Sequence, residues 1–346
     1  MAQVRVSVAG ASGYGGGEVV RLLVGHPEVR LVHLTAETRA GEPYGEVFPN
    51  IRGLVPHHTE TLDPVRLADA DVVVLALPNG AAMTLVPQLP PTVKVVDLGA
   101  DFRFADARTY EQWYGRPHTA EALLAEAAYG LPELHRARIR RARIVGTPGC
   151  YPTAALLAAA PFLQQGLVRA EGIVVDAKSG VSGAGRSAGP RTHFSEVNEN
   201  VQPYSTPGHR HTGELEEQVR ALAGAAAAVT FTPHLVPMTR GILATVYLQP
   251  TRALTQAEAD EVLHEAYRGE PFVRVLPAPA LPQTKATLGS NFCDVAVRVD
   301  GRTGWVVAFA AIDNLVKGAA GQAVQNLNLL CGFPEALGLR APGLFP

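Results

Sequence analysis

Cys150, His211 and Glu214 are the residues of this sequence whose types and spacing indicate covalent chemistry. Cys150 lies in a Gly/Pro-rich stretch, 146–153, between an apolar segment typical of a strand and the alanine- and leucine-rich segment 154–160, which predicts a helix. Unpaired N–H groups and the positive end of the dipole at a helix start favour a thiolate, the nucleophilic form. A small structural cysteine in a tight turn is the alternative interpretation.

His211 and Glu214 are three residues apart at the start of a predicted helix, so their side chains share one face. A carboxylate in that position can fix the tautomer and orientation of the imidazole. We therefore predict that His211 is the acid/base group that works with Cys150 and that Glu214 orients it. Metal binding by His209 and His211 is the competing interpretation. No third ligand at a familiar spacing accompanies them, so we predict no metal.

A glycine triplet, Gly10, Gly13 and Gly16, follows the first predicted strand, 4–9, and precedes a predicted helix, 18–23. This G-x-x-G-x-x-G spacing is a variant of the dinucleotide-binding turn. Glycines there permit a tight turn and bring the pyrophosphate close to the helix N-terminus. An ordinary glycine-rich loop is the alternative.

The end of the second predicted strand, 29–35, is where the cofactor's ribose is recognised in such domains. Glu37 would suit the 2′-hydroxyl of NAD, whereas Thr38 and Arg39 would suit the 2′-phosphate of NADP. We predict NADP, with a solvated loop as the alternative.

The elements that must position these residues change character at Cys150. Strands and helices alternate before it, and the continuous apolar run 72–77 is typical of a parallel strand buried on both faces. The strands expected after Cys150 indicate one mixed or antiparallel sheet. The sequence thus predicts an α/β chain with a Rossmann-type, doubly wound nucleotide-binding domain, 1–149, to which the C-terminal helical segment 315–346 returns. An α+β catalytic and dimerisation domain, 150–314, completes the prediction.

The composition excludes several classes of protein. With 47% hydrophobic and 18% charged residues in a chain of 346, a folded protein of two domains is expected. A net charge of −2 gives no reason to expect nucleic acid or a membrane as a partner. We see no signal peptide or transmembrane run, and three widely spaced cysteines suit a reducing cytoplasm.

Several stretches of the sequence together resemble the N-acetyl-gamma-glutamyl-phosphate reductase family, which is similar in fold and chemistry to aspartate-semialdehyde dehydrogenase. They run nearly from end to end of the chain: 10–16, 148–153, 178–186, 208–211 and 312–323. Thr147 is a departure, because many relatives carry asparagine just before Pro-Gly-Cys. The resemblance implies a catalytic domain of the semialdehyde-dehydrogenase type, NADPH as hydride donor, an acyl phosphate as substrate, and a homodimer or homotetramer.

The resemblance also implies roles for individual residues. Cys150 would be the nucleophile, His211 the acid/base and Glu214 its orienter. The residues expected to hold the cofactor are Gly10, Ser12, Gly13, Tyr14 and Gly15 at the pyrophosphate, Thr38 and Arg39 at the 2′-phosphate, and Asn314 near the nicotinamide. The candidates for holding substrate phosphate or carboxylate, with plain surface charges as the alternative, are Arg103, Arg186, His209 and Arg210.

The family has two branches. One reduces N-acetyl-glutamyl phosphate in arginine synthesis, and the other reduces 2-aminoadipate 6-phosphate linked to a small acidic carrier protein in lysine synthesis. Segments 202–205, 289–292 and 338–344 look more like the lysine branch, and five arginines within residues 135–143 form a patch on which an acidic carrier would dock. The lysine branch is the leading expectation here and the arginine branch the alternative. A non-catalytic NADP-binding sensor is the remote third, although it would not need Cys150, His211 and Glu214 together.

Overall fold

The chain forms two compact units. The computed structural model describes residues 3–345, of which 3–148 and 319–341 make the first unit and 149–318 and 342–345 the second. The C-terminal return to the first unit is therefore shorter than the expected 315–346. Residues up to Gly318 stay with the second unit because Gly318 packs against Cys150, and the tail stays there because the Leu344 N–H donates to the carbonyl of Leu288 at 2.7 Å.

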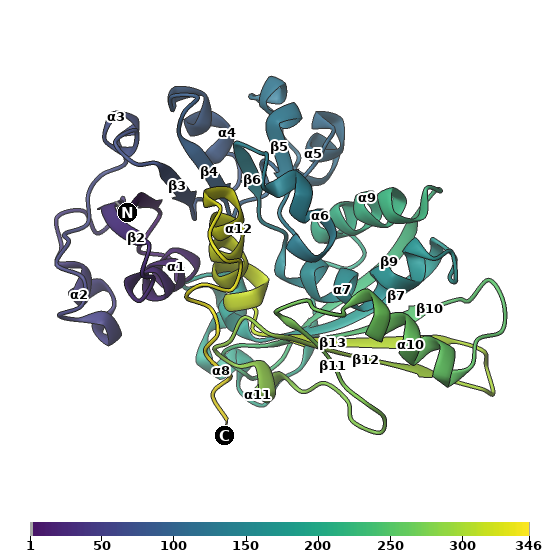
Figure 1. Cartoon of the computed structure of the whole chain (residues 1–346). Coiled ribbons are helices and arrows are strands. Elements are labelled where there is room, and N and C mark those ends of the chain that lie inside the picture. The colour runs from purple at the N-terminus through teal and green to yellow at the C-terminus, as the bar shows by residue number, and fades with distance from the viewer. Residues whose placement is uncertain (1–2, 346) are drawn as a thin grey trace. The chain divides into compact units, whose positions relative to one another are not determined.

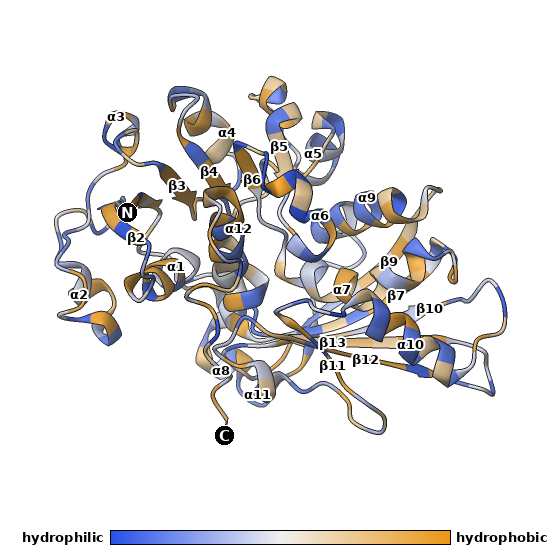
Figure 2. Cartoon of the chain, viewed as in Figure 1, coloured by the Kyte–Doolittle hydropathy of each residue, from blue (hydrophilic) through white to orange (hydrophobic). Residues whose placement is uncertain are grey.

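The first unit is built on a six-stranded, wholly parallel sheet of order β2-β1-β3-β4-β6-β5. Its inner strand β3 is a continuous apolar run, as is typical of a parallel sheet covered on both faces, and Figure 2 shows β3 as hydrophobic. The doubly wound α/β expectation is confirmed. The strands are β1 (Val4–Ala9), β2 (Val29–Leu34), β3 (Val72–Leu75), β4 (Lys94–Asp97), β5 (Ala127–Tyr129) and β6 (Ile144–Gly146).

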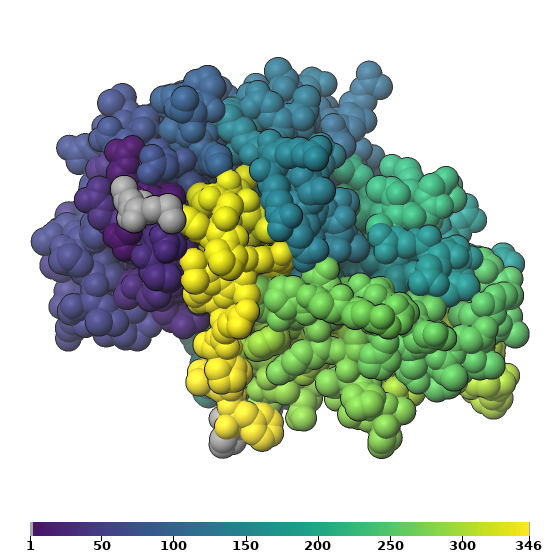
Figure 3. Space-filling model, in the orientation of Figure 1, coloured from purple at the N-terminus to yellow at the C-terminus, as the bar shows by residue number. Residues whose placement is uncertain are grey.

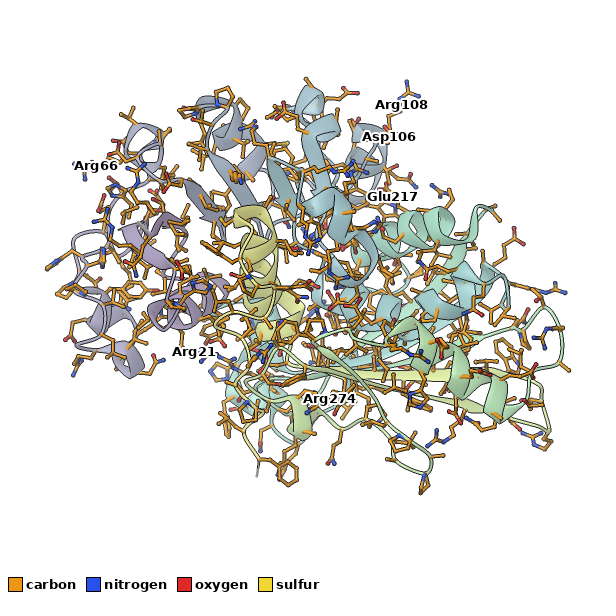
Figure 4. All side chains as sticks on the ribbon, viewed as in Figure 1. Arg21, Arg66, Asp106, Arg108, Glu217 and Arg274 are labelled. Carbon is orange, nitrogen blue, oxygen red and sulfur yellow. The ribbon has the colours of Figure 1, made fainter. Side chains whose placement is uncertain are left out.

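The helices of this unit include the returning C-terminal helix, which packs against the first one. In Figure 3 its yellow residues lie against the purple residues of the N-terminal part. The start of α5 is capped by Asp106, whose carboxylate accepts the Arg108 N–H at 2.9 Å; Figure 4 labels both residues. The helices are α1 (Tyr14–Val24), α2 (Tyr44–Val47), α3 (Pro64–Leu67), α4 (Ala82–Leu85), α5 (Ala107–Tyr114), α6 (Pro132–Ile139) and α12 (Gly321–Cys331).

The second unit is built on a seven-stranded mixed sheet of order β11-β12-β13-β10-β7-β9-β8. Two of its pairings, β7 with β9 and β11 with β12, are parallel and the others antiparallel, so the expected mixed sheet is present. The strands are β7 (Glu171–Ser179), β8 (Gln202–Pro203), β9 (Ala228–Leu235), β10 (Ile242–Leu248), β11 (Val273–Val275), β12 (Cys293–Val299) and β13 (Val306–Ile312).

Helix α7, which begins at Cys150, is the central helix of the second unit. It packs on the middle of the sheet and against α9, and its residues 151–163 are all buried (Figure 1). At another edge, Arg274 of β11 pairs with Asp294 of β12 at 2.5 Å and lies over the Phe292 ring; Figure 4 labels Arg274. The helices are α7 (Cys150–Gln164), α8 (Phe194–Val197), α9 (His211–Ala223), α10 (Gln256–Ala266) and α11 (Thr284–Thr287).

The described residues contain no helix that is long and apolar enough to cross a membrane.

Candidate active site

Cys150 is the first residue of α7, as its Gly/Pro-rich surroundings predict. Gly149 is the N-cap, and its carbonyl accepts both the backbone N–H and the hydroxyl of Thr153, at 2.9 and 3.0 Å. Cys150 is partly exposed, whereas residues 151–163 of the helix are buried. Substrate can therefore reach the sulfur at the positive end of a rigid helix.

The predicted acid/base pair lies beside this helix start. His211 is the first residue of α9, and Glu214 is in the first turn of the same helix with 1% of its surface exposed. Glu214 Oε1 accepts the backbone N–H of Gly149 at 2.8 Å. The His211 ring lies so close to Gly149 that a Cβ built on this glycine would be 2.5 Å from Nε2. The structure thus brings Cys150, His211 and Glu214 together.

Gly318 packs against the proposed nucleophile, and sequence reasoning did not single it out. It lies in a π-helical turn, Val316–Ala320, which precedes α12 within the segment 315–346 that the sequence predicted to be helical. A Cβ at Gly318 would be 2.8 Å from Cys150 Cβ, so only glycine lets this turn pack against the nucleophile. Single π turns recur at functional sites, and a glycine inside a helical pattern was the signal available in the sequence.

An aromatic cluster surrounds the start of both helices. The Tyr204 hydroxyl donates to the Tyr151 hydroxyl at 3.1 Å, and Tyr151 donates to the carbonyl of His234 at 3.3 Å. Burial raises the pKa of both tyrosines above the ordinary value, so both hydroxyls stay protonated. The ring of His209 packs edge-on against Tyr151, Tyr204 and Phe231.

His209, a sequence candidate for holding substrate phosphate or carboxylate, would do so as a neutral ring. Burial, with a smaller contribution from Arg210, lowers the pKa of His209 to about 4, so the ring is neutral at pH 7. Its Nδ1 accepts the backbone N–H of His211 at 3.1 Å. His209 therefore holds the first residue of α9, and with it His211, in place.

The three arginine candidates are in different settings. Arg186 and Arg210 are exposed in the second unit, beyond the loop after β7 and just before α9. Arg103 is in the first unit, where it donates to the carbonyls of Thr147 at 2.7 Å and Leu98 at 2.8 Å. These two hydrogen bonds hold the backbone just before Pro148 in place. Substrate binding by these arginines stays a prediction.

The glycine turn of the first unit is shaped as the cofactor prediction requires. Gly10 has φ +79°, and a Cβ there would be 2.3 Å from the carbonyl oxygen of Ala76; a Cβ on Gly16 would be 2.3 Å from that of Gly10. Gly13 is the N-cap of α1, which begins at Tyr14. N–H groups in the first turn of a helix have no intrahelical partner, so this turn fits a pyrophosphate bound against the start of α1.

The predicted 2′-phosphate residues follow β2. Arg39 is engaged with Glu42 at 2.5 Å and keeps 30% of its side-chain surface exposed, and Thr38 is exposed. Glu37 Oε1 accepts the Leu62 N–H at 3.3 Å, which ties that carboxylate to the neighbouring loop. The residues present fit an NADP ribose phosphate, with Glu42 as an internal competitor for Arg39.

Asn314, expected near the nicotinamide, is buried at 2% exposure in the second unit. Its Oδ1 accepts the Gly241 N–H at 2.7 Å, and its Nδ2 donates to the Ser182 hydroxyl at 3.0 Å. The side chain thus joins the end of β13 to the start of β10 and to the turn after β7. Its contact with the cofactor stays a prediction.

Asp97, at the carboxyl end of β4, is a buried titratable group that sequence reasoning did not single out. It is completely buried; Oδ1 accepts the Gly99 N–H at 2.8 Å, whereas Oδ2 has no hydrogen-bond partner. Burial, reinforced by the negative charge of Asp101, raises the pKa of Asp97 to about 7. Its main-chain carbonyl accepts the Thr147 N–H at 2.7 Å, so it adjoins the segment leading to Cys150.

Comparisons with known proteins agree with this geometry. The family described as "Semialdehyde dehydrogenase, NAD binding domain" matches residues 5–142, and "Semialdehyde dehydrogenase, dimerisation domain" matches residues 150–314. N-acetyl-gamma-glutamyl-phosphate reductases of Pelotomaculum thermopropionicum and Desulforudis audaxviator are 52% and 54% identical to this chain, over 99% of it and 99% and 100% of their own lengths. The chain belongs to the N-acetyl-gamma-glutamyl-phosphate reductase family.

Solved structures of lower sequence identity share the fold of this chain. Aspartate semialdehyde dehydrogenase II of Vibrio cholerae, solved with ASA, matches 96% of this chain and 99% of its own with a TM-score of 0.73 at 18% identity, which shows a shared fold. Membership of the reductase family makes the chain an NADP-dependent oxidoreductase of the phosphorylating semialdehyde-dehydrogenase type, with NADPH as cofactor, in amino-acid biosynthesis. The predicted family, fold and cofactor are confirmed. Among the described residues, no group of histidine, cysteine or carboxylate side chains is arranged to hold a metal ion.

Proposed function

We propose that this chain reduces N-acetyl-glutamyl 5-phosphate to N-acetyl-glutamate semialdehyde with release of phosphate. The observation that carries the proposal is the joining of Cys150 to the acid/base helix, through the Gly149 N–H held by Glu214 and the His211 ring packed on Gly149. N-acetyl-gamma-glutamyl-phosphate reductases at 52% and 54% identity support this choice of substrate.

The thiolate of Cys150 attacks the acyl carbon of the substrate, and the carbon–oxygen bond to phosphate breaks with its electron pair leaving on phosphate. A thioester remains on Cys150. N–H groups of the first turn of α7 stabilise the negative charge that develops on the acyl oxygen during this addition.

NADPH, which the glycine turn 10–16 and Thr38 and Arg39 would hold, would supply a hydride for reduction of the thioester. His211 then gives and takes the protons: it protonates the oxygen of the hydride adduct and accepts that proton again as the carbon–sulfur bond breaks, releasing the semialdehyde and the thiolate. Glu214 holds the helix start that carries Cys150, and His209, kept neutral, holds His211.

The carrier-linked aminoadipyl substrate, which the sequence analysis placed first, becomes the second candidate. The arginine-rich segment that favoured it is largely occupied within the first unit. Arg136 pairs with Glu335 at 2.6 Å, Arg143 with Glu126 at 2.7 Å, and Arg138 donates to the carbonyl of Ala127 at 2.7 Å. A docking patch made of all five arginines is therefore not available.

The deciding experiment compares kcat/KM of the purified enzyme for N-acetyl-glutamyl phosphate and for 2-aminoadipate 6-phosphate on its carrier protein. We expect the first to be turned over faster; faster turnover of the carrier-linked substrate would reverse the order of the two candidates.

Replacement of Cys150 tests the nucleophile and the sensor alternative together. Semialdehyde oxidation with phosphate and NADP should be abolished in Cys150→Ala and kept in Cys331→Ala, whose thiol is also partly exposed. Unchanged activity in Cys150→Ala would remove the nucleophile assignment, and inactivity of the wild-type enzyme on every acyl phosphate would favour the sensor.

The homo-oligomer belongs to the same proposal, because residues 150–314 match a domain described as a dimerisation domain. A cytoplasmic setting is supported by Cys150, Cys293 and Cys331, none of which forms a disulfide in the described chain.

A further inference from the structure

An arginine-lined cavity lies in the first unit, and none of the residues assigned to catalysis lines it. Its volume is about 560 Å³, and its charged lining is Glu126, Arg138, Arg141 and Arg143. Arg143 directly precedes β6, and Ala127 begins β5, which pairs with β6 and packs against α6 (Figure 1). The cavity is thus at the amino ends of these strands, whereas the segment leading to Cys150 leaves the carboxyl end of β6.

The charges around the cavity are unbalanced. Three guanidinium groups face one carboxylate, and that carboxylate is already used by Arg143 Nε at 2.7 Å. Arg138 donates one hydrogen bond to the Ala127 carbonyl, at 2.7 Å. The guanidinium of Arg141 is exposed and, within residues 3–345, makes no hydrogen bond or ion pair.

Arg143 adds an unused donor to this surplus of charge. Its Nη1 is buried and has no hydrogen-bond partner, and the whole side chain is 17% exposed. A buried charged donor without a partner loses free energy relative to one that is bonded. Positive charges gathered at one site also repel each other, and a bound anion would offset this surplus charge without contacting the buried Nη1.

We propose that this cavity is a binding site for a small organic or inorganic oxyanion that carries at least two negative charges as phosphate or carboxylate groups. Guanidinium forks match the geometry of both groups and bind them with two parallel hydrogen bonds. A cavity of about 560 Å³ is within the size range of small-molecule sites, so the ligand can be larger than phosphate itself. The proposal is independent of the substrate assigned above.

The test uses the full-length NADP-bound enzyme and two probes, inorganic phosphate and succinate, measured by titration calorimetry. Arg141→Ala is compared with Arg140→Ala, which removes an equally exposed arginine one position away that does not line the cavity. We expect the affinity of the cavity for the anion to fall at least about tenfold in Arg141→Ala and to be unchanged in Arg140→Ala. Anion binding at the catalytic site is common to all three proteins and cancels in this comparison.

A second measurement needs no variant. Phenylglyoxal modifies accessible arginines, and peptide mass spectrometry separates Arg140 from Arg141. We expect saturating anion to protect Arg141 and not Arg140. Protection by phosphate alone would identify a phosphate site, and protection by succinate alone a carboxylate site. Equal modification with and without both anions, together with equal binding in the two variants, would overturn the proposal.

Discussion

Gly149→Ala isolates the contact between the nucleophile loop and the acid/base histidine. A Cβ at this position would lie 2.5 Å from His211 Nε2, 2.8 Å from Cε1 and 2.9 Å from Cδ2. Ordinary contacts between such atoms are about 3.5–4.0 Å, so the imidazole or the loop must move by about 1 Å. The backbone itself does not resist, because φ −64° and ψ 153° are open to alanine.

A misplacement of about 1 Å in a catalytic arrangement costs roughly a hundredfold in rate. We therefore expect kcat for reduction of the acyl phosphate to fall by about two orders of magnitude, with a much smaller change in the KM for NADPH, because the nucleotide turn is in the other unit. The rate at which iodoacetamide alkylates Cys150 should change its pH profile as well, since the imidazole beside the thiol has moved.

Gly208→Ala is the matched control. It adds the same methyl group to the segment before α9, where a Cβ would meet nothing within 4 Å. Its kcat, alkylation profile and thermal midpoint should stay at wild-type values. If Gly149→Ala keeps kcat within about threefold of wild type, or if both variants lose activity alike, then the close packing of His211 on Gly149 does not matter for the reaction.

Three further variants test single groups. Burial raises the pKa of the Asp97 carboxyl in the folded protein to about 7, from an ordinary value of 3.8, so its ionisation destabilises the fold as pH rises through this range. Urea unfolding at pH 5 and pH 8 should show the stability of Asp97→Asn gaining about 2–3 kcal/mol on that of wild type, and a pH-independent difference would contradict this. His209 gives the opposite pH dependence of stability. Its pKa is about 4 in the folded protein against an ordinary 6.5, so the free energy of unfolding falls as pH drops from 6.5 to 4. Over that interval His209→Asn, which keeps an acceptor for the His211 N–H, should gain about 2 kcal/mol of stability on wild type, and parallel stability curves would refute this. Arg39→Ala should raise the KM for NADPH at least about tenfold and leave the KM for NADH nearly unchanged. The control Arg52→Ala, which removes an exposed arginine paired with Glu46, should change neither KM. An equal rise of both KM values in Arg39→Ala would remove the 2′-phosphate assignment.

Much of the site follows from local sequence signals. The glycine spacing 10–16 between a strand and a helix predicts the nucleotide turn, and the structure shows why glycine is needed at Gly10 and Gly16. The Gly/Pro stretch before an alanine-rich segment predicts that Cys150 begins a helix, and the three-residue spacing predicts that His211 and Glu214 share the start of another. These features depend on φ/ψ preferences and helical periodicity within a few residues, which is the range over which a sequence pattern is informative.

The sequence was less informative about elements whose form depends on packing. It predicted a helical segment from residue 315, but the chain makes a π turn there, in which Gly318 approaches Cys150, a residue far away in the sequence. It proposed His209 as a candidate for holding phosphate or carboxylate, but it could not show that a buried aromatic neighbourhood keeps the ring neutral.

The sequence by itself predicted the two-part architecture, the cofactor turn and the residues proposed as nucleophile and acid/base partner. Only the tertiary structure decided that Glu214 holds the Gly149 N–H, that Asp97 is buried with one oxygen unbonded, and which arginines of the segment 135–143 are occupied. The physical reason is that charge state and hydrogen bonding depend on burial and on partners distant in sequence. Composition and local spacing carry no record of those neighbours until the chain has packed.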